Sequence, residues 1–243
     1  MSARTTTPFP SRPVRGLGVT RLVLAAVCAV ALVARYIWGL GSATFEPGNF
    51  FGYLIIQSNI LFVVVSVSSA VPLLRARLTR PWVEALRAAV LTCTITSGIV
   101  FALIVQQSSV RAIRVDVPWS DVVLHFILPV IALIDWAVTP RASRTPRRMI
   151  PIVLGYTLGW GGVTMIRGGN TGWYPYYFLD PNQTNGLGEF LLLSGAALTV
   201  FAVVGLLVLG VSVISVSLRL RLRRRAGGSS APPRAAPHRP AWR

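Results

Sequence analysis

The chain has 243 residues, of which 53% are hydrophobic and only 13% are charged, and its mean hydropathy is +0.62. Soluble domains carry about a quarter charged residues, so this composition excludes an ordinary soluble enzyme. The formal net charge of +17 would suggest nucleic acid in a soluble protein. Here the basic residues lie in short segments between apolar blocks, so membrane topology explains them better and we expect no nucleic-acid partner.

Six apolar blocks follow one another, each near the length of about 20 residues that a helix needs to cross the hydrocarbon core. They predict an all-α, polytopic membrane protein: a six-transmembrane-helix bundle that forms a single membrane domain over residues 17–220. The predicted spans cover about residues 19–40, 50–74, 82–106, 119–138, 149–166 and 187–218.

The two ends of the chain, residues 1–16 and 221–243, are rich in Pro, Arg, Ala and Ser and are typical of disordered basic tails. A secretory signal over residues 21–34 is an alternative for the N-terminus, because an arginine precedes an apolar core and small residues there. Arg35 and Trp38 continue the block like the interfacial end of a span, which favours a first transmembrane helix.

The arginines predict the orientation. All 24 basic residues are arginines, and twenty of them lie before or at the start of the first span, bordering the second and fourth connections, or after the sixth span. Cytoplasmic connections carry the excess of basic residues. The pattern therefore predicts a multi-pass protein of the plasma membrane with both termini in the cytoplasm. The tryptophans support the same spans, because tryptophan is enriched at membrane interfaces. Trp38, Trp119 and Trp173 fall at predicted outer ends, and Trp82 and Trp136 fall at predicted inner ends.

Several kinds of site are not predicted. Cys28 and Cys93 both lie inside apolar blocks, so they are interpreted as small buried hydrophobes. His125 is the only histidine in the predicted spans, which argues against a metal site. Neither a phosphate-binding glycine loop nor a GxSxG elbow is present, and we expect no metal or cofactor.

The fourth span is the most informative. Asp121 precedes His125 by four residues, so the two share a helix face. A carboxylate there could fix the imidazole tautomer and stabilise its protonated form. Pro129 lacks an N–H, so the His125 carbonyl loses its helix donor and needs a partner or a cavity. The alternative is that His125 only ties two helices together by a hydrogen bond.

The second span contains a polar step of Gln57, Ser58 and Asn59. Ser58 and Asn59 lie roughly 12 Å below the predicted outer end, and His125 lies roughly 9 Å below it. The matched depth predicts that Ser58 and His125 face each other in an outward-facing pocket. Helix–helix hydrogen bonding is the alternative for this step.

Other polar residues lie near the outer ends of the first, fifth and sixth spans: Arg35, Arg167 and Glu189. The loop before the sixth span contains the aromatic run Tyr174 to Phe178, including Tyr176. This run is either an interfacial turn or a lid over the mouth of the bundle. Gly155 and Gly159 have the small-xxx-small spacing that lets another helix approach closely.

Three segments together resemble the Pr-six-Pr family of actinobacterial integral membrane proteins. They are the Gln57–Asn59 step, the H-x-x-x-P…DW pattern from His125 to Trp136, and the YPYYFLD run from Tyr174 to Asp180. The resemblance covers roughly residues 20–215. That family is distantly similar to the androgen-induced-gene family of six-span hydrolases, which cleave fatty-acid esters of hydroxy fatty acids with an intramembrane threonine and a histidine.

The resemblance implies that His125 matches the family histidine. The family threonine falls at Ile55, which has no nucleophile. Ser58, one helical turn deeper, is the nearest replacement. The leading hypothesis is therefore a lipid-ester hydrolase with Ser58 as nucleophile, His125 as general base, Asp121 as its orienting carboxylate, and Gln57 or Asn59 as oxyanion donor.

Two other functions stay open. The first is a non-catalytic membrane protein that binds a lipid or small molecule, which the missing threonine favours. The second is a small-solute transporter, although no inverted repeat is evident. The expected partners are membrane lipids, with a lipid or acyl ester as the ligand, whereas the sequence predicts no oligomeric state.

Overall fold

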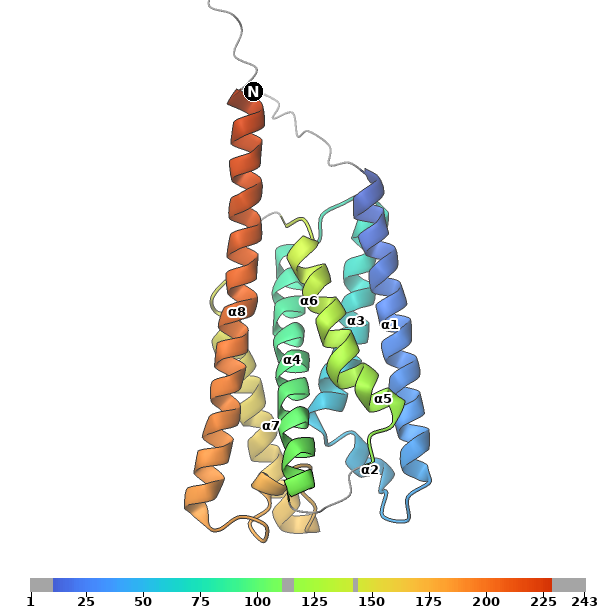
Figure 1. Ribbon diagram of the computed structural model, residues 1–243, viewed down its shortest axis with the longest axis vertical. Coiled ribbons are helices and arrows are strands. Elements are labelled where there is room, and N and C mark those ends of the chain that lie inside the picture. Colours follow the sequence, from blue (N-terminus) through green and yellow to red (C-terminus); the bar gives the residue numbers. More distant parts are fainter. Residues whose placement is uncertain (1–10, 111–115, 142–143, 229–243) are drawn as a thin grey trace, which may run out of the picture.

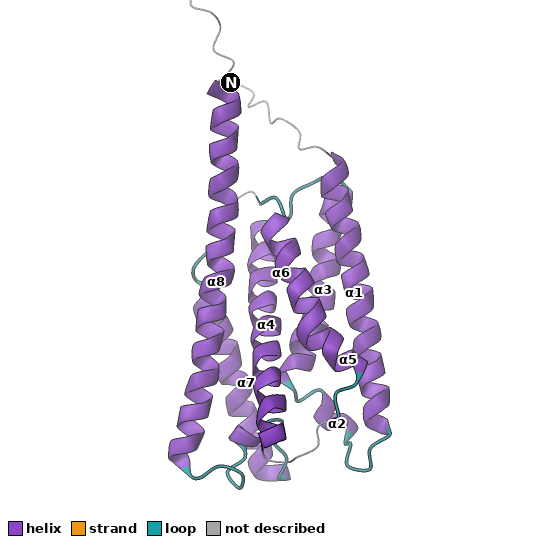
Figure 2. Cartoon of the chain, in the orientation of Figure 1, coloured by secondary structure: helices purple, strands orange, loops and turns teal. Residues whose placement is uncertain are grey.

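The computed structural model describes residues 11–110, 116–141 and 144–228 (Figure 1). All regular structure in these residues is helical, and no strand occurs among them (Figure 2). The elements are α1 (Ser11–Leu40), α2 (Pro47–Phe50), α3 (Leu54–Leu74), α4 (Pro81–Val110), α5 (Trp119–Val122), the π-helical turn η1 (Val123–Ile127), α6 (Leu128–Val138), α7 (Met149–Thr171), the 3₁₀ turn η2 (Tyr177–Leu179) and α8 (Leu187–Gly228).

Six segments of the described chain are long and apolar enough to cross a membrane, which confirms the predicted all-α six-helix bundle. The chain is thus a multi-pass integral membrane protein. The fourth of these segments, α5, η1 and α6 taken together, is called the fourth span below. The spans are Val14–Leu40, Leu54–Leu74, Pro81–Gln106, Trp119–Val138, Met149–Thr171 and Leu187–Leu218.

The helices are longer than the predicted spans at several ends. α1 already begins at Ser11 and α8 continues to Gly228, so both include residues predicted as tail. Arginine and leucine are good helix formers, and a helix continues through them beyond its apolar part. The rest of the predicted tails, residues 1–10 and 229–243, lies outside the described residues.

Two other boundaries shift for local reasons. α3 begins at Leu54 rather than at residue 50, because Pro47 starts the separate short helix α2. α7 runs past the predicted end at residue 166 to Thr171, and Gly172, in the left-handed conformation with φ of 72°, terminates it. Arg167 is therefore part of the helix.

The helices form one bundle with two distinct ends (Figure 1). α4 lies at its centre and contacts α3, α6, α7, α8 and η1, whereas α1 packs mainly against α3 and along the fourth span. We call the end with residues 41–53 and 172–186 the aromatic end. The opposite end, with residues 75–80 and the described part of 139–148, is called the arginine end.

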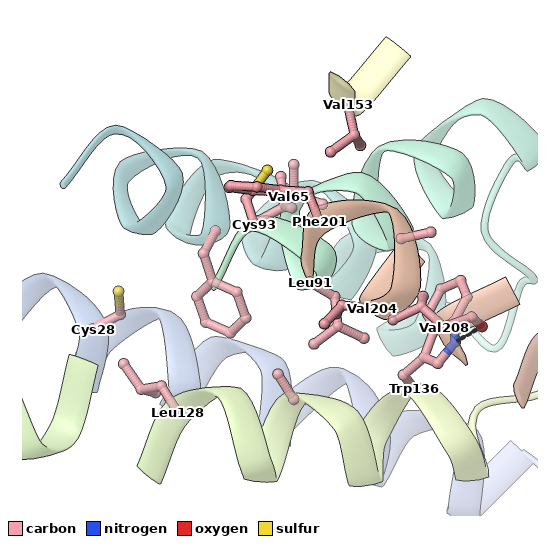
Figure 3. Close-up of a cluster of buried hydrophobic side chains, with 14 of the residues drawn as sticks. Cys28, Val65, Leu91, Cys93, Leu128, Trp136, Val153, Phe201, Val204 and Val208 are labelled. Atoms are coloured by element: carbon pink, nitrogen blue, oxygen red, sulfur yellow. Dashed lines mark hydrogen bonds between the residues drawn. The ribbon is translucent and has the colours of Figure 1, made fainter. Parts of the chain in front are cut away.

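The core lies between these helices (Figure 3). Trp136 is fully buried there, and its indole N–H donates to the carbonyl of Val208 in α8 at 3.0 Å. Cys28 and Cys93 are free and buried among apolar side chains, which confirms their interpretation as hydrophobes. The sulfur and indole groups thus serve packing in the middle of the bundle.

The close helix approach predicted at Gly155 and Gly159 is not made within the described chain. A Cβ atom added at either glycine would meet nothing within 4 Å. The close approach occurs at Gly98 of α4 instead, where an added Cβ would overlap the carbonyl oxygen of His125. This contact fixes α4 against the fourth span at the level of the candidate site.

Candidate functional site

The backbone of the fourth span departs from α geometry at His125. Leu128 N–H bonds the carbonyl of Val123, five residues earlier, which makes the π turn. Pro129 has no N–H to offer the His125 carbonyl, as the sequence predicted. That carbonyl instead points at the Cα of Gly98, the arrangement of a Cα–H···O contact. The acceptor that proline leaves free is thus covered by a neighbouring helix.

The imidazole of His125 is held by two contacts. Its Nδ1 lies 2.9 Å from the backbone carbonyl oxygen of Asp121, and its ring stacks on Phe101 with centroids 3.9 Å apart. Because a carbonyl can only accept, Nδ1 carries the proton in this contact. Nε2 is then the nitrogen that can accept a proton or a hydrogen bond.

Asp121 orients the imidazole through its backbone, and the predicted contact between its carboxylate and His125 is not made. The carboxylate accepts a hydrogen bond from Arg35 Nε at 2.8 Å instead. An isolated carboxylate at membrane depth is costly, so an available guanidinium outcompetes the imidazole for it. Arg35 also lies over the ring of Trp38, 4.6 Å from its centroid.

These three residues line one cavity at the aromatic end, which we call the polar cavity. Its volume is about 250 Å³, and Arg35, Asp121 and His125 share its wall with Tyr53, Ser97 and Tyr176. Arg35 and Asp121 neutralise each other across the wall. The polar cavity therefore offers hydrogen-bonding groups with little net charge.

Ile55 also lines the polar cavity, whereas Ser58 and Asn59 are not among its lining residues. The Ser58 hydroxyl and the Asn59 amide both donate to the carbonyl of Ile55, each at 3.0 Å. Both side chains are buried. Ser58 thus does not line the cavity that His125 lines, and the hydrogen-bonding alternative describes Ser58 and Asn59 better.

Gln57 points away from the polar cavity. Its amide N–H donates to the carbonyl of Phe51 at 2.9 Å, and its amide oxygen accepts from the Tyr156 hydroxyl of α7 at 2.6 Å. An oxyanion donor must point at the reacting carbonyl. Gln57 instead links the start of α3 to α7.

An apolar groove of about 450 Å³ adjoins the polar cavity between α4, α7 and α8. Ser97, Val100 and Tyr176 line both spaces. The groove is walled by apolar residues such as Phe190 and Phe201. We call it the apolar groove. The same three side chains thus separate a polar compartment from an apolar one.

Ser97 was not singled out from the sequence, although it is the serine that lines both spaces. It lies one helical turn from Phe101, the residue on which His125 stacks. The Ser194 hydroxyl, on the groove side, is buried and has no hydrogen-bond partner within the described chain. Serines are common in membrane helices, so the sequence held no specific signal for either.

Tyr176 closes the polar cavity from the loop before α8, together with Pro175. Its hydroxyl lies near the backbone N–H groups of Leu54 and Ile55 at the start of α3, where helix N–H groups lack partners. Burial raises the pKa of Tyr176 and also that of Tyr53 in the neighbouring loop. The aromatic loop is thus part of the cavity wall rather than a detached turn.

The other candidate residues lie outside the polar cavity. Arg167 donates to the side chain of Asn49 and covers the ring of Trp173. Tyr174 packs on Gly168. Glu189 accepts from the backbone N–H of Asn185 at 2.6 Å, before the first turn of α8. These residues shape the loops at the aromatic end and do not contribute to the cavity wall.

A second polar cluster lies at the arginine end. From the sequence, its arginines were interpreted only as indicators of membrane topology. Asp135 accepts from Arg21 at 3.0 Å and from Arg87, and Arg87 also bonds Glu84 at 2.8 Å. Arg141 lies 3.5 Å from the same Glu84. The hint in the sequence was the equal spacing of Arg21 from Arg35 and of Asp121 from Asp135. We call the following five residues the buried ionic network: Arg21, Glu84, Arg87, Asp135 and Arg141.

No family model, curated protein or solved structure matches this chain.

Proposed function

We propose that this membrane protein binds a neutral amphiphile with one long acyl chain, and that a fatty-acyl ester is its leading ligand. The polar group would lie in the polar cavity beside Arg35, Asp121 and His125, and the acyl chain in the apolar groove. The observation that carries the proposal is the wall shared by the two spaces, made by Ser97, Val100 and Tyr176.

The charge balance supports a neutral polar group. Arg35 is already paired with Asp121 at 2.8 Å, so a carboxylate or phosphate ligand would have to displace the aspartate. An ester or hydroxyl needs only hydrogen-bond donors and acceptors, which Tyr53, Ser97 and His125 offer in the same wall. The size of the apolar groove, about 450 Å³, suits one acyl chain.

The location follows from the arginines. We propose that the protein lies in the plasma membrane with both termini in the cytoplasm, so that the polar cavity opens toward the outer leaflet. The exposed arginines that flank the spans at the arginine end support this orientation. A ligand would then enter from the outer leaflet through the apolar groove.

Hydrolysis of such an ester is the second candidate function, and it is the activity that the resemblance to the Pr-six-Pr and androgen-induced-gene families implies. One observation favours it: the Asp121 carbonyl fixes the proton on His125 Nδ1 and leaves Nε2 to act as a base. Binding is the better supported of the two, because a hydroxyl within hydrogen-bond reach of His125 is not found in the described chain.

The binding proposal is tested with a fatty-acyl ester that carries a diazirine in its chain. The purified protein is reconstituted in phosphatidylcholine vesicles, irradiated and mapped by mass spectrometry. We expect crosslinks on groove residues such as Phe201, and we expect Gly161→Phe, which fills the groove, to reduce them at least tenfold.

Gly155→Phe is the matched control, because Gly155 lies on the same helix, has open space around it and does not line the groove. It should leave the crosslinks unchanged. Labelling spread evenly over all lipid-facing helices, or equal labelling of the two phenylalanine variants, would contradict the proposal.

A further inference from the structure

The arginine end carries exposed arginine side chains that lack an acidic partner. Within the described residues, no carboxylate lies within ion-pair distance of them. Arg144 donates only to the Ser217 hydroxyl, at 3.3 Å. The exposed set consists of Arg75, Arg77, Arg80, Arg144, Arg147 and Arg148.

The acidic residues at this end cannot neutralise that surface. Glu84 and Asp135 are both buried, and both are bonded to arginines of the buried ionic network. The network itself joins three arginines to two carboxylates, so it also has an excess of positive charge. The other carboxylates of the described chain, Glu46, Asp116, Asp121, Asp180 and Glu189, belong to the opposite half of the bundle or its connections.

The depth of the exposed arginines indicates the kind of partner. Arg75 directly follows the span that ends at Leu74, and Arg80 directly precedes the span that begins at Pro81. Arg148 stands in the same way before Met149. Residues at span ends lie at the level of the lipid headgroups, where arginine meets phosphate.

We propose that the arginine end is a binding surface for acidic phospholipids, with the guanidinium groups of Arg75, Arg77 and Arg80 around the headgroup phosphate. A planar guanidinium binds phosphate through two parallel hydrogen bonds, which ammonium cannot do. The surface is separate from the polar cavity at the other end of the bundle. The lipid-binding proposal is therefore independent of the proposed acyl-ester ligand.

The test measures the binding of phosphatidylglycerol and of phosphatidylcholine to the full-length protein in detergent, by native mass spectrometry and by the shift in Tm. We expect a clear preference for phosphatidylglycerol that falls when the salt concentration rises. Replacing Arg75, Arg77 and Arg80 with Gln should weaken phosphatidylglycerol binding about fivefold for each arginine removed. Replacing the same three with Lys, which keeps the charge but not the paired hydrogen bonds, should weaken phosphatidylglycerol binding less than the Gln changes do.

Glu46→Gln is the matched control, since it raises the net charge by one in the exposed loop at the aromatic end. It should leave the lipid preference unchanged. Equal binding of the two lipids by the wild type would overturn the proposal, as would a Gln variant that keeps its preference. An RNA oligonucleotide or polyglutamate that displaces phosphatidylglycerol at equal concentration would assign the surface to another polyanion instead.

Discussion

Arg35 Nε donates to Asp121 Oδ1 at 2.8 Å and so joins the end of α1 to the start of the fourth span. Arg21 and Asp135 make the equivalent pair at the opposite end of the same two helices, at 3.0 Å. The two helices run antiparallel (Figure 1). The same number of residues separates the two arginines as separates the two aspartates, so both pairs form in one register.

The two pairs should differ in what they contribute to stability. The Arg35 side chain is 27% exposed, whereas that of Arg21 is 2% exposed. Removing one partner of a buried pair costs about 3–5 kcal/mol, because the other charge is left without a partner. Asp135→Asn should therefore destabilise the protein by that amount. Asp121→Asn should cost clearly less, since water or lipid headgroups can reach Arg35. Thermal unfolding in detergent measures both, and equal losses would contradict this ranking.

Replacement of Gly98, the single glycine of α4, should destabilise the protein. A side chain there would push the His125 carbonyl away, so Gly98→Ala should destabilise the protein by about 1–3 kcal/mol despite the higher helix propensity of alanine. Gly155→Ala serves as the control, because the space around Gly155 is open, and it should leave Tm unchanged or raise it slightly. A neutral Gly98→Ala variant would show that α4 and the fourth span do not touch there.

Tyr176→Phe should destabilise the start of α3 by about 1 kcal/mol, because it removes the polar oxygen near the N–H groups of Leu54 and Ile55. The pKa of Tyr176 is raised by burial, so its stabilising contribution is complete below the unfolded-state pKa of about 10 and declines as the pH rises further. The wild type should lose more stability than Tyr176→Phe between pH 10 and pH 12 in thermal unfolding. Parallel losses in the two proteins would argue against a buried phenol.

Ile55→Thr tests the hydrolase hypothesis at the position of the family threonine. Ile55 lines the polar cavity with His125, and the two β-branched side chains are similar in size, so the variant should fold. If the chemistry is dormant, hydrolysis of a long-chain ester should rise in Ile55→Thr, and a second change of His125→Gln should abolish the increase.

Ser58→Ala is the comparison for that experiment. The Ser58 hydroxyl bonds only to the Ile55 carbonyl in the described chain, so its loss should leave any ester hydrolysis unchanged. Hydrolysis by the wild type that disappears in Ser58→Ala would restore Ser58 as the nucleophile. If the wild-type and Ile55→Thr proteins are folded but hydrolyse no acyl ester, hydrolysis is ruled out and binding remains as the proposed function.

The orientation is tested with single cysteines in the connections. Cysteines at Ser42 and Asn182, both exposed at the aromatic end, should react with an impermeant maleimide in intact cells. A cysteine at Arg77, exposed at the arginine end, should react only after the membrane is permeabilised. Labelling of the Arg77 position from outside would reverse the proposed topology.

The number and approximate position of the spans could be predicted, because each span is a run of apolar residues long enough to cross the membrane. The fourth span, residues 119–138, agrees with the structure at both ends. The ends of α1, α7 and α8 were set too short, since polar and glycine residues that end an apolar run do not end a helix. The break before α3 depends on the separate helix that Pro47 begins.

The candidate site was predictable in part. Counting from the span ends correctly placed Arg35, Asp121 and His125 in one region. Depth alone does not determine which neighbour a side chain bonds, so it could not predict the hydrogen-bond partner of Ser58. A hydroxyl in an apolar helix bonds most easily to a carbonyl one turn earlier, which here is that of Ile55. The buried ionic network was missed for a related reason, because its arginines already had an explanation as topology signals.

The paired arginines of α1 also bear on how the protein is made. Arg35 is separated from its aspartate by 86 residues of chain, and Arg21 from its aspartate by 114. The first helix is therefore synthesised with two charges whose partners do not yet exist. Release of this helix into lipid as a finished span would leave Arg21, seven residues inside the span Val14–Leu40, without its carboxylate, which is costly at membrane depth. We therefore expect the first helix to be stabilised in the bundle only when the fourth span arrives and supplies both carboxylates.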